Sequence, residues 1–153
     1  MDTAIPDARA NAADVPGSLW SAGLWAAALS ALVNAILLAV AVIAGVFPGL
    51  PIVPFAGPAF GLGSVVLVSA AAALAGTALY SVLWHRAERP MQVFALIVAC
   101  VLLVSFAAPM FEKNWTAVRL GVMELTHLVV AGITVYALWR WTRAATHYPE
   151  ARG

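Results

Sequence analysis

Charged residues are scarce in this sequence, and between Val15 and Trp84 there are none. Asp, Glu, Lys and Arg make up 10% of the 153 residues, whereas hydrophobic residues make up 63%. Soluble domains carry roughly 25% charged residues, and a fold in water needs charged positions on its surface. The composition therefore excludes an ordinary soluble domain and indicates an integral membrane protein in contact with a lipid bilayer.

Cysteines and clusters of basic residues are also missing. Cys100 is the only cysteine, so no disulfide can form within the chain. The net charge is only +1, and the Lys and Arg residues fall singly or in pairs between hydrophobic segments. Because phosphate binding needs clustered Lys and Arg, we expect no nucleic-acid partner.

Four apolar segments are long enough to cross a bilayer, which requires about 20 helical residues each. Each connection between them contains Pro, Gly or charge, as in FPGLPIVPFAGPAFGLG and HRAERP. We predict an all-α fold, a four-helix transmembrane bundle within residues 19–141. Its spans are predicted at 19–46, 62–84, 91–109 and 119–141, between a disordered cytoplasmic tail (1–18) and a cytoplasmic C-terminal tail (142–153).

The distribution of basic residues predicts the orientation of the bundle. An even number of spans places both termini and the HRAERP loop on one side, and the positive-inside rule assigns the more basic side to the cytoplasm. One side carries six basic residues and the other carries two. These are Arg9, Arg86, Arg89, Arg140, Arg143 and Arg152 against Lys113 and Arg119. Both termini are therefore predicted to be cytoplasmic.

Small and polar residues predict which helix faces point inward, because membrane helices pack through them. In the first span, Gly23, Ala27 and Asn34 share one face, and Leu32 and Ile36 lie opposite. The third span carries little besides polar Ser105, so we interpret it as an apolar closing wall. Together the spans are expected to enclose a polar cluster, which comprises Asn34, Glu124 and His127, joined by Thr77 and Thr134.

Glu124 and His127 are the ionisable residues of this cluster. An unpaired charge at mid-bilayer costs about 2.5–3.5 kcal/mol even on the insertion scale. Their three-residue spacing lets a carboxylate accept a hydrogen bond from the imidazole on one helix face. We therefore expect either this pair or an uncharged Glu124.

Metal, haem and hydrolytic chemistry find little support in the sequence. Glu-x-x-His occurs in di-iron bundles, but such a site needs further Glu or His from other helices. The first three spans supply none within the membrane, and His85 lies too far along the axis to oppose His127 on a haem. No Gly-x-Ser-x-Gly turn is present. We expect no bound cofactor and assign no catalytic residue.

The membrane region as a whole resembles a known family. Its four spans, its Pro/Gly-rich first outer loop, the proline that closes the third span and the segment HLVVAGITV are similar to a family of small uncharacterised bacterial four-helix membrane proteins, a domain of unknown function. The resemblance implies the fold and a bacterial inner-membrane location. It implies no activity, and His127 alone matches the family pattern.

Three functional hypotheses remain. The first is a non-enzymatic inner-membrane protein that binds a partner or a small apolar ligand around the polar cluster, or is merely stabilised by that cluster. The alternative is a proton-coupled transporter or channel component, in which Glu124 and His127 exchange protons. The third is a membrane redox protein that uses quinone, haem or metal. Small residues on several faces also allow a homo-oligomer.

Overall fold

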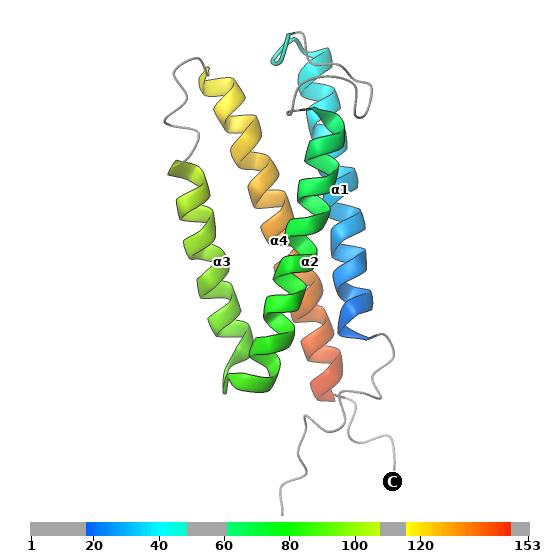
Figure 1. Ribbon diagram of the computed structural model, residues 1–153, viewed down its shortest axis with the longest axis vertical. Helices are drawn as coiled ribbons and strands as arrows, with labels where there is room; N and C mark the ends of the chain where they lie inside the picture. The colour runs from blue at the N-terminus through cyan, green and yellow to red at the C-terminus, as the bar shows by residue number, and fades with distance from the viewer. Residues whose placement is uncertain (1–17, 49–60, 108–115, 148–153) are drawn as a thin grey trace, which may run out of the picture.

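Four membrane-spanning helices form the described part of the protein. The computed structural model describes residues 18–48, 61–107 and 116–147. These residues form α1 (Leu19–Ile43), α2 (Leu62–Arg86), α3 (Pro90–Ala107) and α4 (Ala117–His147). The helices run alternately up and down, so α1 begins and α4 ends at the lower end of the bundle as drawn in Figure 1. All four are long and apolar enough to cross a membrane, which confirms the predicted all-α, four-helix fold.

The helix ends differ in detail from the predicted spans. α3 begins at Pro90. Proline is tolerated there because the N–H of a first helical residue has no intrahelical hydrogen-bond partner. α4 continues to His147, past the predicted end at residue 141, because Ala145 remains buried against the bundle. The predicted end of the third span at Pro109 and most of the two predicted tails lie outside the described residues.

α1 ends in a Schellman motif, earlier than residue 46. Gly45 has a φ of 76°, a left-handed conformation that glycine adopts without strain. The Val46 N–H donates to the Ala41 carbonyl at 2.9 Å, and the Gly45 N–H donates to the Val42 carbonyl at 3.0 Å, which is the bond pattern of this motif. Arg119 of α4 donates from Nε to the Val46 carbonyl at 2.8 Å. The end of α1 is thus fixed to the beginning of α4.

The inward face of α1 consists mostly of small residues, as predicted, with Leu38 as a large exception. Gly23, Ala27 and Asn34 are buried, whereas Leu32 and Ile36 are exposed. At Gly23 the helix lies directly against α2: a Cβ built on this glycine would come within 2.5 Å of the Thr77 side chain. The small face therefore allows α1 and α2 to approach closely.

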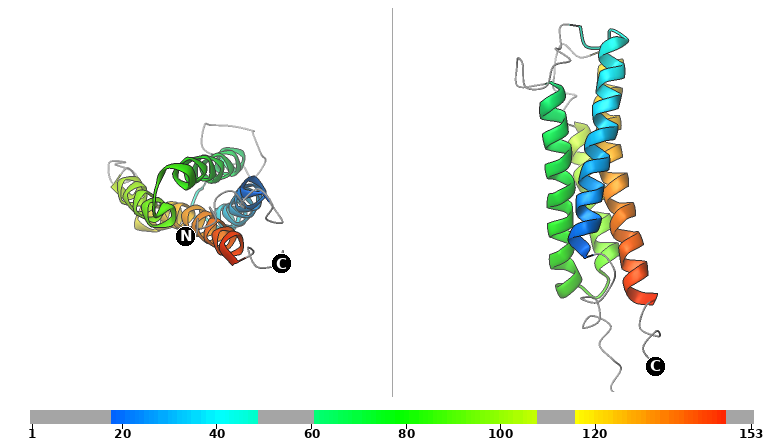
Figure 2. Two further views of the ribbon diagram at one scale, coloured as in Figure 1. Left: turned by 90° about the horizontal axis from the view of Figure 1, so that it is seen from below. Right: turned by 90° about the vertical axis from the view of Figure 1, so that its right-hand side faces the viewer.

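α3 is held mainly at its lower end. Phe94 is the one described residue of α3 that is buried, and its ring packs edge-on against Tyr80 with centroids 5.3 Å apart. Leu138 and Trp141 of α4 complete this lower core. From below, α3 lies at the edge of the bundle, away from α1 (Figure 2). Toward the upper end α3 diverges from α2 (Figure 1), which leaves the space between them for the site below.

Candidate functional site

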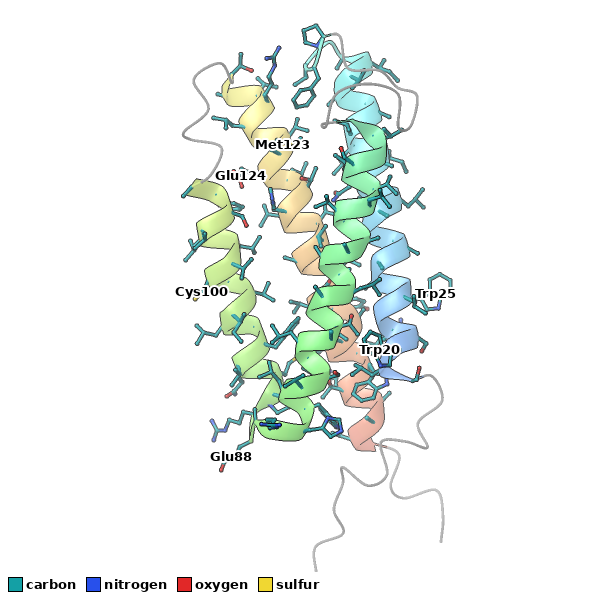
Figure 3. All side chains as sticks on the ribbon, viewed as in Figure 1. Trp20, Trp25, Glu88, Cys100, Met123 and Glu124 are labelled. Atoms are coloured by element: carbon teal, nitrogen blue, oxygen red, sulfur yellow. The ribbon has the colours of Figure 1, made fainter. Side chains whose placement is uncertain are left out.

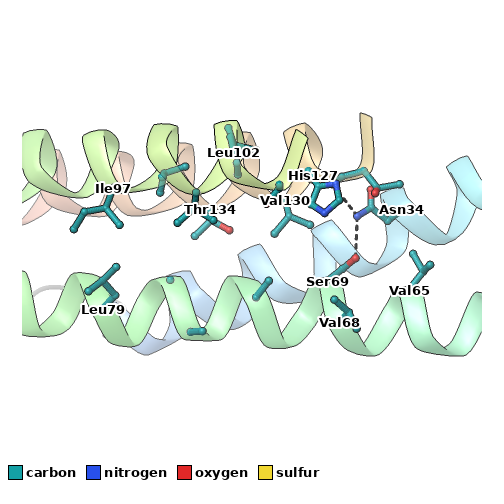
Figure 4. Close-up of a pocket in the computed structure, with 18 of the residues that line it drawn as sticks. Asn34, Val65, Val68, Ser69, Leu79, Ile97, Leu102, His127, Val130 and Thr134 are labelled. Carbon is teal, nitrogen blue, oxygen red and sulfur yellow. Dashed lines mark hydrogen bonds between the residues drawn. The ribbon is translucent and has the colours of Figure 1, made fainter. Parts of the chain in front are cut away.

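A cavity of about 620 Å³ lies between α2, α3 and α4. Its walls are mostly apolar, with Val65 and Leu79 from α2, Ile97 and Leu102 from α3, and Val130 from α4 (Figure 4). Asn34 reaches it from α1. None of its lining residues is Asp, Glu, Lys or Arg. The cavity is therefore an uncharged, largely apolar chamber within the membrane-spanning part of the protein.

The cavity exists because small residues of α2 face a helix that stands away from them. Ala72, Ala75 and Gly76 line it from α2, and none of them has a side chain long enough to fill the space. Phe94 anchors α3 below and lines the cavity as well. The sequence interpretation of α3 as a closing wall is therefore incomplete, because it did not identify this anchor.

The cavity opens sideways between α2 and α3. Val68 of α2 and Val101 of α3 both line it, yet they are 67% and 58% exposed. Ala72 and Ala75 are likewise exposed. Because these residues belong to membrane-spanning helices, their exposed surfaces face lipid. The cavity is therefore accessible from a side of the bundle that faces the bilayer.

Asn34 joins three helices at one wall of the cavity. Its Nδ2 donates to Ser69 Oγ of α2 at 2.9 Å and to the Thr126 carbonyl of α4 at 3.1 Å. A carbonyl oxygen only accepts hydrogen bonds, so the amide nitrogen must be the atom that faces Thr126. Both N–H groups of the amide are thus committed. The sequence analysis placed Asn34 in the interior but did not identify Ser69 as its partner, although Ser69 opens the small-residue run SAAAALAGT.

Replacing Asn34 by leucine is expected to lower the free energy of unfolding by about 1–2 kcal/mol, near the upper end of measured interhelical polar contacts in membranes. Both hydrogen bonds are lost, and a side chain of similar size remains. Ser30 offers a matched control one turn away, because its buried Oγ has no partner; Ser30→Ala should be neutral or slightly stabilising. Unfolding in bicelles measures both variants, and an Asn34→Leu protein as stable as wild type would contradict the bridging role.

His127 lines the cavity from α4 and is exposed there. Its Nδ1 lies 2.9 Å from the Met123 carbonyl, one turn back along the same helix. The Thr126 hydroxyl donates to the same carbonyl at 2.7 Å. The imidazole is therefore oriented by the backbone of its own helix.

Glu124 lies apart from the cavity. It is not among the lining residues, and in Figure 3 it appears at the height of the upper end of α3. Its Oε2 is buried and has no hydrogen-bond partner. The expected hydrogen bond between Glu124 and His127 is absent from the described residues, because the ring donates to the Met123 carbonyl instead.

The two threonines of the predicted cluster occupy different places. Thr134 lines the cavity, and its buried Oγ1 has no partner. Thr77 faces α1, where its side chain packs against Gly23. The Thr77 hydroxyl donates to the Ala73 carbonyl of its own helix. Of the five predicted residues, the structure thus brings Asn34, His127 and Thr134 to one cavity and leaves Glu124 and Thr77 outside it. Within residues 18–48, 61–107 and 116–147, no group of three or more His, Cys, Asp or Glu could hold a metal ion.

A protein-family model matches most of the chain. Residues 15–144 match the model described as "Family of unknown function (DUF6069)", which covers α1, α2 and α3 and most of α4. No curated protein and no solved structure matches the chain. This match and the four apolar helices agree with two parts of the resemblance described above, the unknown function and the four membrane spans.

Proposed function

The chain belongs to the DUF6069 family, whose function is unknown. From the geometry of the structure, we propose that the protein is a non-enzymatic membrane protein that binds a small, largely apolar ligand. The observation that carries this proposal is the cavity of about 620 Å³ between α2, α3 and α4. Ligand sites typically have volumes of about 300–1,000 Å³ and apolar walls with a few polar groups. The cavity has both properties, and its sideways opening suits a ligand supplied by the bilayer.

The two other hypotheses have less support in the geometry. Proton exchange between Glu124 and His127 would need the two groups to communicate, but His127 is bonded to the Met123 carbonyl and Glu124 is not on the cavity. A redox role would need a binding site for an electron carrier such as a quinone. The cavity is large enough for an apolar carrier, but the polar groups on its uncharged walls are only a few hydroxyls, an amide and one imidazole.

We also propose that the lower end of the bundle faces the cytoplasm of a bacterial cell. Arg86 and Arg89 lie at the lower connection between α2 and α3, and Arg140 and Arg143 lie toward the lower end of α4. Arg119 lies near the beginning of α4 at the upper end. The positive-inside rule supports this orientation. Alkaline phosphatase fused to the C-terminus should stay inactive in a bacterial host, and an active fusion would reverse the assignment.

Filling the cavity tests ligand binding. Ala131 lines the cavity from α4, so Ala131→Phe places a ring in the space that a ligand would occupy. The probe is hexadecanol with a photoreactive diazirine in its chain, added to the full-length protein in lipid nanodiscs. We expect Ala131→Phe to reduce saturable labelling by roughly fivefold or more, since the ligand loses most of its contacts.

Ala99→Phe is the matched control, because Ala99 is exposed on α3 and does not line the cavity. It adds the same ring to the lipid-facing surface and should leave saturable labelling unchanged. Equal labelling of wild type and Ala131→Phe, in proteins with the same helical content, would refute binding in the cavity.

A further inference from the structure

We infer that the ligand is a neutral alcohol whose hydroxyl donates a hydrogen bond to Nε2 of His127. This inference rests on the proposed function and specifies the chemical class of the ligand. It follows from the hydrogen-bonding state of one ring and of the polar groups around it.

The tautomer of His127 is set by its helix. The Met123 carbonyl, 2.9 Å from Nδ1, can only accept a hydrogen bond, so Nδ1 must carry the proton. In a neutral imidazole the other nitrogen, Nε2, then has a free lone pair. His127 therefore presents a hydrogen-bond acceptor.

Neighbouring donors of the protein are already occupied. Both N–H groups of Asn34 are used by Ser69 and the Thr126 carbonyl, and the Thr126 hydroxyl is used by the Met123 carbonyl. Thr134 lies about two helical turns, roughly 10 Å, further along α4. Among the described residues, no hydrogen bond reaches Nε2, and the ring is exposed in the cavity. Ser105 of α3, which lines the same cavity, supplies a further hydroxyl, and an occupant of the cavity can supply the donor that Nε2 lacks.

The surroundings restrict the kind of donor. An ammonium group would bring a positive charge into a cavity that has no carboxylate, which is costly within a bilayer. Quinones, ethers and esters only accept hydrogen bonds and would leave the lone pair of Nε2 unmatched. A hydroxyl group can donate to Nε2 while its oxygen accepts from Ser105, which lines the same cavity from α3. An alcohol with a long apolar body satisfies these conditions.

Two photoreactive probes of nearly equal shape separate the donor requirement from binding itself. The first is hexadecanol with a diazirine in its chain, and the second is its methyl ether, which lacks the hydroxyl proton. With wild-type protein in nanodiscs, we expect the alcohol to label with about fivefold higher apparent affinity, the effect of one hydrogen bond. His127→Phe keeps a ring without nitrogen and should abolish this preference. His127→Gln supplies an amide oxygen as acceptor and should restore part of it.

The outcomes distinguish the inference from the proposed function. If neither probe labels saturably, the proposed function fails. If both label saturably with equal affinity, the cavity binds ligands but the donor requirement is refuted. A preference for the alcohol that persists in His127→Phe refutes the assignment to His127. If His127→Phe does not fold, the ratio of the apparent affinities of the two probes for the wild-type protein still decides. A ratio near one overturns the inference.

Discussion

Phe94→Ala is expected to lower the free energy of unfolding by about 3–5 kcal/mol, the range for truncating a fully buried phenylalanine. Phe94 is 0% exposed and is the one described residue of α3 that is buried. Its removal leaves a void beside Tyr80 and deletes the edge-on ring contact at 5.3 Å. Because α3 has no comparable anchor among the described residues, the lower wall of the cavity should be lost as well. Labelling by photoreactive hexadecanol should therefore fall together with stability.

Leu96→Ala is the control for this prediction. Leu96 lies on the same helix but is 66% exposed, so it faces lipid and its truncation should change stability by well under about 1 kcal/mol. Unfolding of both variants in bicelles, followed by circular dichroism, gives the comparison. Equal effects of Phe94→Ala and Leu96→Ala would contradict the anchoring of α3 by Phe94.

Gly23→Ala is expected to lower the free energy of unfolding by about 2–3 kcal/mol, as overpacking of a close contact does. The added Cβ would lie 2.5 Å from both Cγ2 and Oγ1 of Thr77 and 2.9 Å from its Cβ. The Thr77 side chain is fully buried and donates to the Ala73 carbonyl at 2.9 Å, so it cannot easily move aside. α1 and α2 must separate instead, and the small-residue face loses its packing.

Gly132→Ala makes the same chemical change in open space, since a Cβ there meets no atom within 4 Å. This control should be neutral or stabilising, because alanine is favoured over glycine in a helix by roughly 0.5–1 kcal/mol. Thr77→Ala in the Gly23→Ala background should recover part of the loss by removing Cγ2 and Oγ1. Additive effects of the two substitutions would contradict a direct contact between these residues.

The sequence was sufficient to predict the fold and the inward face of α1. Length and apolar composition determine the number of spans, because a bilayer has a fixed thickness. The contrast between Gly23 or Ala27 on one side and Leu32 or Ile36 on the other determines which side packs inward, and the burial pattern confirms it. Both features depend on local sequence alone.

The cavity and the environment of the polar residues were beyond such reasoning. The position of α3 depends on one long-range contact, between Phe94 and Tyr80, and a phenylalanine in an apolar span gives no sign of its partner. His127 can choose between the carboxylate of Glu124 and the Met123 carbonyl, both about one turn away. The structure has the second arrangement, and residue spacing does not discriminate between them.

The most direct test of a lipid-accessible ligand site is to map where photoreactive hexadecanol attaches to the wild-type protein. Labelling is carried out in nanodiscs with and without excess unlabelled hexadecanol, and adducts are located by mass spectrometry. Binding in the cavity predicts that competitor removes adducts from Ala72, Ala75 and Val101 but spares those on the exposed α1 residues Leu24 and Trp25. Adducts that are spread over both surfaces and respond equally to competitor would contradict a ligand site between α2 and α3.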